Sequence, residues 1–214
     1  MHRAIQKYRR PLPASHMQFP IEYPLSLSFK IVALAPQFSI RDANGNLLGY
    51  VKQKLFKLKE SVTVFADESL TQPLYVLSAD RIIDFSAQYY FADTSGAIIG
   101  SVKRQGMRSL WKAHYDIMDG EEVTMSIREE NGWVKFLDAL FSEIPIVGIF
   151  AGYVFHPRYR IERPDGSVVM RMKKRSAFLQ GKFELEKMEA MEEGEEKRTL
   201  LSVIMMLLLE RMRG

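Results

Sequence analysis

The sequence predicts a mainly β fold, with about a dozen short antiparallel strands in a sandwich or closed barrel and a buried hydrophobic helix at the C-terminus. Three observations lead to this prediction: a hairpin pattern that occurs three times, further strand-like segments at short spacing, and an apolar run near the end of the chain. The 214 residues, 47% hydrophobic and 26% charged, are enough for one domain with a sizeable core. This composition excludes a collagen-like, low-complexity or wholly disordered chain.

The hairpin pattern occupies residues 38–52, 89–103 and 159–173. In each copy an alternating aromatic or aliphatic run meets a pair of turn residues, and a second aliphatic run follows. The pairs are Asn44-Gly45, Ser95-Gly96 and Asp165-Gly166. Glycine supplies the positive φ that a tight primed turn or a bulge requires, so we expect all three glycines to lie in turns.

Further strands are predicted at Ser61–Ala66, Leu74–Ala79 and Arg81–Ser86, with turn residues between the first two. Strands at this spacing favour an antiparallel sandwich or a closed barrel. From Trp133 to Phe141 the apolar residues change to helical spacing. That segment predicts a surface helix that ends near Pro145.

The last apolar run, Leu200 to Leu209, is interrupted only by Ser202. As a helix it presents apolar side chains in nearly every direction, so it must be buried on all sides. A closed sheet of about twelve strands is too wide for its own side chains to fill, and a hydrophobic helix would fill it. Ten residues span about 15 Å and typical strands about 17–20 Å, so the lengths are compatible. We therefore expect a helix at about 197–212 inside a barrel.

The chain is expected to form a single domain over residues 18–214, preceded by a basic, flexible extension over residues 1–17. The net charge of +4 arises in that extension, which contains no acid and four basic residues, Arg3, Lys7, Arg9 and Arg10. The remainder carries 26 basic and 26 acidic residues. A neutral body argues against nucleic acid as a partner. The extension lacks the apolar run of a secretory signal.

Signs of catalysis are sparse, and we expect no catalytic residue, no cofactor and no metal site. The chain has no cysteine, which excludes disulfides, thiolate zinc sites and cysteine nucleophiles and is compatible with a cytoplasmic protein. The histidines show no paired ligand spacing; they are His2, His16, His114 and His156. The segment Gly96–Gly100 is not a phosphate loop, because no Gly-Lys-Ser/Thr follows it.

Several strings in the sequence resemble the LURP-one-related family, which is grouped with the tubby C-terminal domain and the phospholipid scramblases. They are Tyr50-Val51-Lys52-Gln53-Lys54-Leu55-Phe56, Val64-Phe65-Ala66-Asp67, Asp84-Phe85-Ser86 and Phe91-Ala92-Asp93-Thr94-Ser95-Gly96. The resemblance covers roughly residues 38–185 and the C-terminal helix. It implies a twelve-stranded antiparallel closed β-barrel wrapped around a central hydrophobic helix.

The resemblance also suggests a surface to examine, because the tubby branch binds phosphoinositide headgroups through basic residues on the barrel. Each copy of the hairpin pattern places basic residues in or just after its second strand. Strand alternation puts them on the outer face. The candidate anionic lipid-binding residues are Lys52, Lys54, Lys103, Arg171, Lys173 and Arg175. If they fall on one side of the barrel they form a basic rim; otherwise they are scattered solubilising charge.

Two functions remain open. The first is a binding module that recognises anionic phospholipid at a membrane surface from the cytoplasm. The second is a protein-interaction scaffold, whose partner is bound through the basic extension or the acidic stretch Glu184–Glu196. That stretch is interpreted as a solvated helix or linker broken at Gly194. Insertion of the terminal helix into lipid is disfavoured, since its apolar run of ten residues falls short of about 20.

Overall fold

The computed structural model describes residues 17, 19–30, 37–52, 61–80, 87–105, 114–130, 158–175 and 181–213. Within these ranges the chain forms twelve strands and one helix, α4 (Glu193–Arg213). The strands are β1 (Leu25–Lys30), β2 (Gln37–Arg41), β3 (Leu47–Lys52), β4 (Ser61–Phe65), β5 (Pro73–Ala79), β6 (Gln88–Asp93), β7 (Ile98–Arg104), β8 (His114–Asp119), β9 (Glu122–Glu129), β10 (Arg158–Glu162), β11 (Val168–Arg175) and β12 (Gly181–Lys187).

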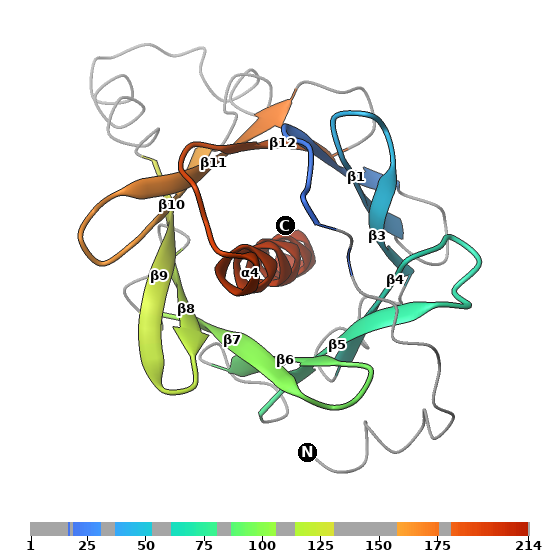
Figure 1. Ribbon diagram of the computed structural model, residues 1–214, viewed down its shortest axis with the longest axis horizontal. Helices are drawn as coiled ribbons and strands as arrows, with labels where there is room; N and C mark the ends of the chain where they lie inside the picture. Colours follow the sequence, from blue (N-terminus) through green and yellow to red (C-terminus); the bar gives the residue numbers. More distant parts are fainter. Residues whose placement is uncertain are drawn as a thin grey trace, which may run out of the picture.

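The strands form a closed antiparallel barrel in which each pairs with its neighbour in the sequence, and β12 closes the ring against β1. Figure 1 looks down the barrel and shows α4 running through the lumen. The predicted fold class is therefore confirmed, including the twelve strands that the family resemblance implied. The segments Ser61–Ala66 and Leu74–Ala79 are confirmed as β4 and β5.

The three copies of the hairpin pattern are β2–β3, β6–β7 and β10–β11. Their turn glycines, Gly45, Gly96 and Gly166, have φ of 85°, 90° and 88°, as predicted. Each hairpin also shifts register at the same place in the pattern, one or two residues before the turn. In the ring the copies are four strands apart, so they point to three different sides.

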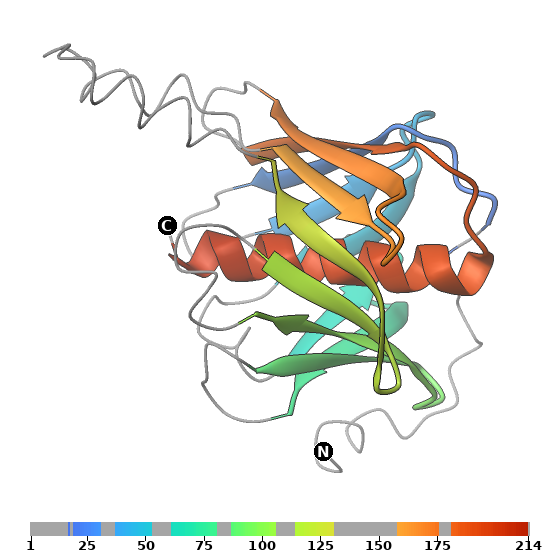
Figure 2. The same cartoon turned by 90° about the vertical axis from the view of Figure 1, so that its left-hand side faces the viewer.

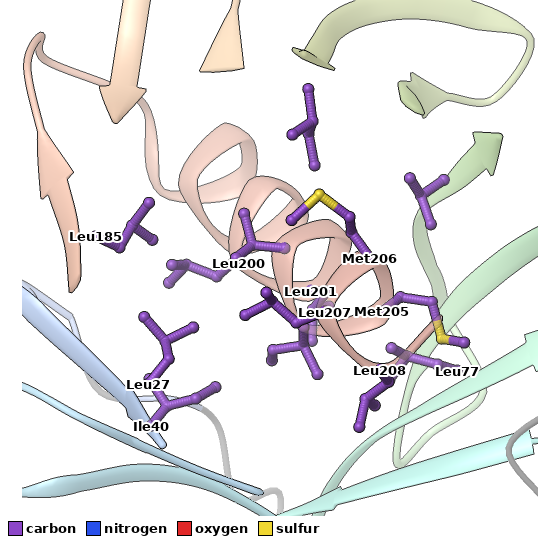
Figure 3. Packing of buried hydrophobic residues seen from close by; sticks show 14 of the residues in the cluster. Leu27, Ile40, Leu77, Leu185, Leu200, Leu201, Met205, Met206, Leu207 and Leu208 are labelled. Atoms are coloured by element: carbon purple, nitrogen blue, oxygen red, sulfur yellow. The ribbon is translucent and has the colours of Figure 1, made fainter. Parts of the chain in front are cut away.

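The core lies between the inner faces of the strands and α4. Figure 3 shows inward side chains from several strands around the helix, among them Leu27, Ile40, Leu77 and Leu185. From Leu200 to Leu208 every helix side chain is buried, and Ile204 is 0% exposed. The helix therefore fills the barrel, as its all-round apolar character predicts.

Helix α4 begins four residues before the predicted start, because the acidic stretch is not a linker. Its first turn contains Glu193, Glu195 and Glu196, whose negative charge is favourable at a helix N-terminus. The earlier glutamates, Glu184 and Glu186, belong to β12. The interpretation of Glu184–Glu196 as a solvated helix or linker broken at Gly194 is thus wrong.

Ionic contacts fasten the start of α4 to the barrel. The buried carboxylate of Glu196 accepts hydrogen bonds from Lys187 Nζ at 2.6 Å and from the Tyr23 hydroxyl at 2.7 Å. Arg163 donates to both carboxylate oxygens of Glu195, at 2.8 and 3.0 Å. Figure 2 shows that the hairpin turns and the start of α4 lie at the same end of the barrel.

The polypeptide before β1 contributes to the core at this end. Met17 is buried, and its backbone N–H donates to the Tyr75 hydroxyl at 3.2 Å. The core thus includes the last residue of the expected extension, whereas residues 1–16 lie outside the described ranges. The predicted strand Arg81–Ser86 and the predicted helix from Trp133 also lie outside them. Within the described part of the chain, no helix has the length and apolar character needed to cross a membrane.

Candidate anion-binding groove

A polar groove of about 200 Å³ lies on the outer wall of β12, β1, β2 and β3. Its centre is formed by Ser28 and Ser39, which face each other across β1 and β2. Cross-strand neighbours extend this row to Lys182 on one side and to Tyr50 on the other. Because serine side chains are short and those around them are long, the wall is hollowed at this point. The complete lining is Ser28, Lys30, Gln37, Ser39, Arg41, Tyr50, Glu68 and Lys182.

The groove carries an excess of positive charge, with three cations against the single carboxylate of Glu68. Arg41 is fixed by the Glu68 carboxylate at 2.8 Å and by the Gly45 carbonyl at 3.0 Å. Lys30 and Lys182 are exposed, and neither forms an ion pair within the described ranges. These two ammonium groups are therefore available to an anionic ligand.

The neutral groups of the groove suit the same chemistry. Burial and the Glu68 carboxylate raise the pKa of Tyr50, so its hydroxyl keeps its proton at neutral pH. Together with Ser28 and Ser39 it supplies a row of hydroxyl donors beside the two lysines. Such donors and ammonium groups match the oxygens of a phosphate or carboxylate. No three Asp, Glu or His side chains come together as a metal site among the residues described.

The residues predicted from the sequence do not share one side of the barrel. Lys52 is on β3, Lys103 is on β7, and the other three, Arg171, Lys173 and Arg175, are on β11. These strands are four apart in the ring, so a single rim across all of them is not formed. Alternation does place the side chains outward, but it carries no information about position around the ring. Lys54 lies outside the described ranges.

The three predicted residues of β11 are already paired with carboxylates. Lys173 Nζ is 2.8 Å from Glu184 Oε1 and also pairs with Glu186, while Arg175 pairs with Glu184. Arg171 lies 3.6 Å from Glu130. The hydrogen bond from Lys173 is the main reason why the pKa of Glu184 is lowered to about 2. Lys52 differs, because it lies opposite Gln37 at the edge of the groove and is exposed.

Sequence reasoning missed the groove because Ser28, Lys30 and Lys182 lie on β1 and β12, outside the repeated pattern. The signal was present in the alternation Leu25-Ser26-Leu27-Ser28-Phe29, which predicts a strand with serines on one face. Its partner β12 is more than 150 residues away in the sequence, and no local pattern identifies that pairing. Lys30 and Lys182 could therefore not be placed together.

A larger, more open hollow of about 570 Å³ lies at the mouth of the barrel, beside the start of α4. Its two cations are engaged: Arg163 by Glu195 and Glu189, and Arg198 by Asp119 at 2.8 Å. The hollow therefore has fewer unpaired cations than the groove to bind an anion.

The model of the LURP-one-related family matches residues 47–191. An X-ray structure of a protein from Arabidopsis thaliana is similar over 92% of this chain and 98% of that chain, at 14% sequence identity and a TM-score of 0.47. No curated protein matches the sequence.

Proposed function

Since this chain belongs to the LURP-one-related family, we propose that it is a non-enzymatic, tubby-like binding module that recognises the anionic headgroup of a phospholipid at the cytoplasmic surface of a membrane. The groove on β12, β1, β2 and β3 would hold the headgroup. Lys30 and Lys182 would neutralise its charge, and the hydroxyls of Ser28, Ser39 and Tyr50 would donate to its oxygens.

The observation that carries the proposal is a pair of exposed lysines on the neighbouring strands β1 and β12, beside a hollow with a serine floor. Neither lysine has an ion pair among the described residues. A basic residue near an anionic membrane surface contributes about 1 kcal/mol. Lys52 adjoins the groove through Gln37, so three lysines would contribute about 3 kcal/mol in total.

Binding without catalysis is supported by the composition of the groove. Its one carboxylate, Glu68, is paired with Arg41 and is thus poorly suited to act as a general base. A serine hydroxyl must have a general base beside it to act as a nucleophile, and the lining of the groove contains no free base next to Ser28 or Ser39.

The alternative, a protein-interaction scaffold, has less support. The acidic stretch that would attract a basic partner is largely paired within the barrel. Lys173 and Arg175 contact Glu184, and Lys187 contacts Glu196. A surface whose charges are already satisfied gains less from a partner of opposite charge.

Co-sedimentation with vesicles of phosphatidylserine and phosphatidylcholine tests the proposal. Lys30→Glu/Lys182→Glu should lower the vesicle partition coefficient by more than about tenfold, which corresponds to 1.4 kcal/mol. The charge-matched comparison is between Lys182→Glu alone and Lys103→Glu, because β7 is six strands from β1, on the opposite side of the ring. Equal losses in these two single variants, or no binding by the wild type, would contradict the proposal, and absent binding would favour the scaffold.

A further inference from the structure

Three arginines stand in one cross-strand row on the outer wall of β9, β10 and β11. Arg160 lies directly opposite Arg128 on one side and Arg171 on the other. Their side chains are 48%, 42% and 54% exposed for Arg128, Arg160 and Arg171. We call these three residues the arginine row.

The row has a cost for the fold, because like charges directly opposite each other destabilise a sheet. Two carboxylates offset it. Glu162 lies 2.9 Å from Arg128 Nε and 2.8 Å from Arg160 Nε, and Glu130 lies 3.6 Å from Arg171 Nε. Arg158, exposed on β10, adds a fourth cation beside the row. Glu186 of β12 lies opposite Arg171 but is paired with Lys173. The four arginines, with Glu162 and Glu130, therefore keep a net positive charge, and a bound anion would relieve the remaining repulsion.

The side chains of the row are only partly covered, which leaves donors open to solvent. The nearest carboxylate atoms meet each guanidinium at Nε, and a guanidinium has five N–H donors in a fixed planar fork. That fork matches the oxygens of a phosphoryl group and binds them in bidentate fashion, which an ammonium group cannot do.

We propose that the arginine row is a second anion site, which binds a ligand carrying two or more phosphoryl groups. Neighbouring strands are about 4.8 Å apart, so the row extends over about 10 Å. One phosphoryl group can bridge two of the guanidiniums, and a second is needed to engage the third. This site is centred on β10, three strands from β1, and it goes beyond the proposed function of the groove.

Isothermal titration calorimetry with sodium tripolyphosphate at constant ionic strength tests the proposal. The informative variant is Arg128→Lys/Arg160→Lys, which keeps the charge and removes the planar forks. It should bind tripolyphosphate at least about tenfold more weakly, whereas its melting temperature should be unchanged because both residues are exposed. Orthophosphate should bind the wild type more weakly than tripolyphosphate.

Vesicles containing phosphatidylinositol 4-phosphate, compared with phosphatidylserine vesicles of equal surface charge, separate a lipid source from a soluble one. Weaker binding of the lysine variant to tripolyphosphate or to the phosphatidylinositol 4-phosphate vesicles supports the proposed site. The probe that is affected shows whether the ligand is soluble or a lipid. Equal binding of both probes by variant and wild type, or no binding by the wild type, overturns it. Lys30→Gln/Lys182→Gln should retain tripolyphosphate affinity, so failure of the groove and failure of the row are distinguishable.

Discussion

The side chain of Arg198 on α4 occupies the space that a side chain on Gly100 of β7 would need. A Cβ at position 100 would clash with Arg198 Cδ and would lie 2.7 Å from the backbone oxygen of Met118. From this position Arg198 donates to the Ile99 carbonyl at 3.1 Å and pairs with Asp119 at 2.8 Å. Because Gly100 has no side chain, Arg198 can reach β7 and β8 and link the central helix to both strands.

Gly100→Ala should therefore destabilise the protein by about 1–3 kcal/mol, the usual cost of overpacking. Gly194→Ala is the matched control, because a Cβ there meets nothing within 4 Å and alanine favours a helix by about 0.5–1 kcal/mol. Urea unfolding should show opposite signs for the two variants. If Gly100→Ala is as stable as the wild type, Arg198 is not seated as described.

Ile204 is 0% exposed near the middle of α4. Ile204→Asp should abolish folding, since an unpaired buried charge costs several kcal/mol. Ile204→Val should cost only about 0.5–1.5 kcal/mol and remain folded. Circular dichroism and thermal melting distinguish the two, and a melting curve of wild-type shape for Ile204→Asp would place the helix outside the core.

Tyr23→Phe should destabilise the protein by about 1.5–3 kcal/mol, because it removes a hydrogen bond to the buried carboxylate of Glu196. Lys187→Met should cost more, about 3–5 kcal/mol, because it leaves that charge without its ionic partner. Unfolding of both variants in guanidinium chloride shows which substitution lowers the free energy of unfolding more. The opposite order would mean that the ion pair is not the main stabiliser of Glu196.

The protein should lose stability in acid, in part because Glu184 becomes protonated. Its pKa is about 2 in the folded protein, against an ordinary value of 4.5, and the main cause is the hydrogen bond from Lys173. A lowered pKa stabilises the fold above the ordinary value, and this contribution is lost as the pH falls from about 4.5 towards 2. Glu184→Gln should therefore flatten the dependence of unfolding free energy on pH in that window. An unchanged slope would show that Glu184 is not held in its charged form.

Local patterns were sufficient to predict much of the fold. The turn glycines and the all-round apolar run specify hairpins and a buried helix through properties of neighbouring residues, and Gly45, Gly96, Gly166 and Ile204 lie where these patterns place them. The candidate site could not be predicted in the same way. Whether Lys52 and Lys173 share a side depends on the order of strands around the ring, and the groove depends on the pairing of β1 with β12.

The most direct test of the proposed function is a map of backbone amide chemical shifts as small anionic vesicles of phosphatidylserine and phosphatidylcholine are added to the labelled protein. The groove predicts that Ser28, Ser39 and Lys182 change most, with smaller changes at Lys52 and none at Lys103 on the opposite wall. The changes should weaken as salt rises, because charge interactions are screened over about 8 Å at physiological ionic strength. Changes centred on β7, or no change on any strand, would contradict headgroup binding in the groove.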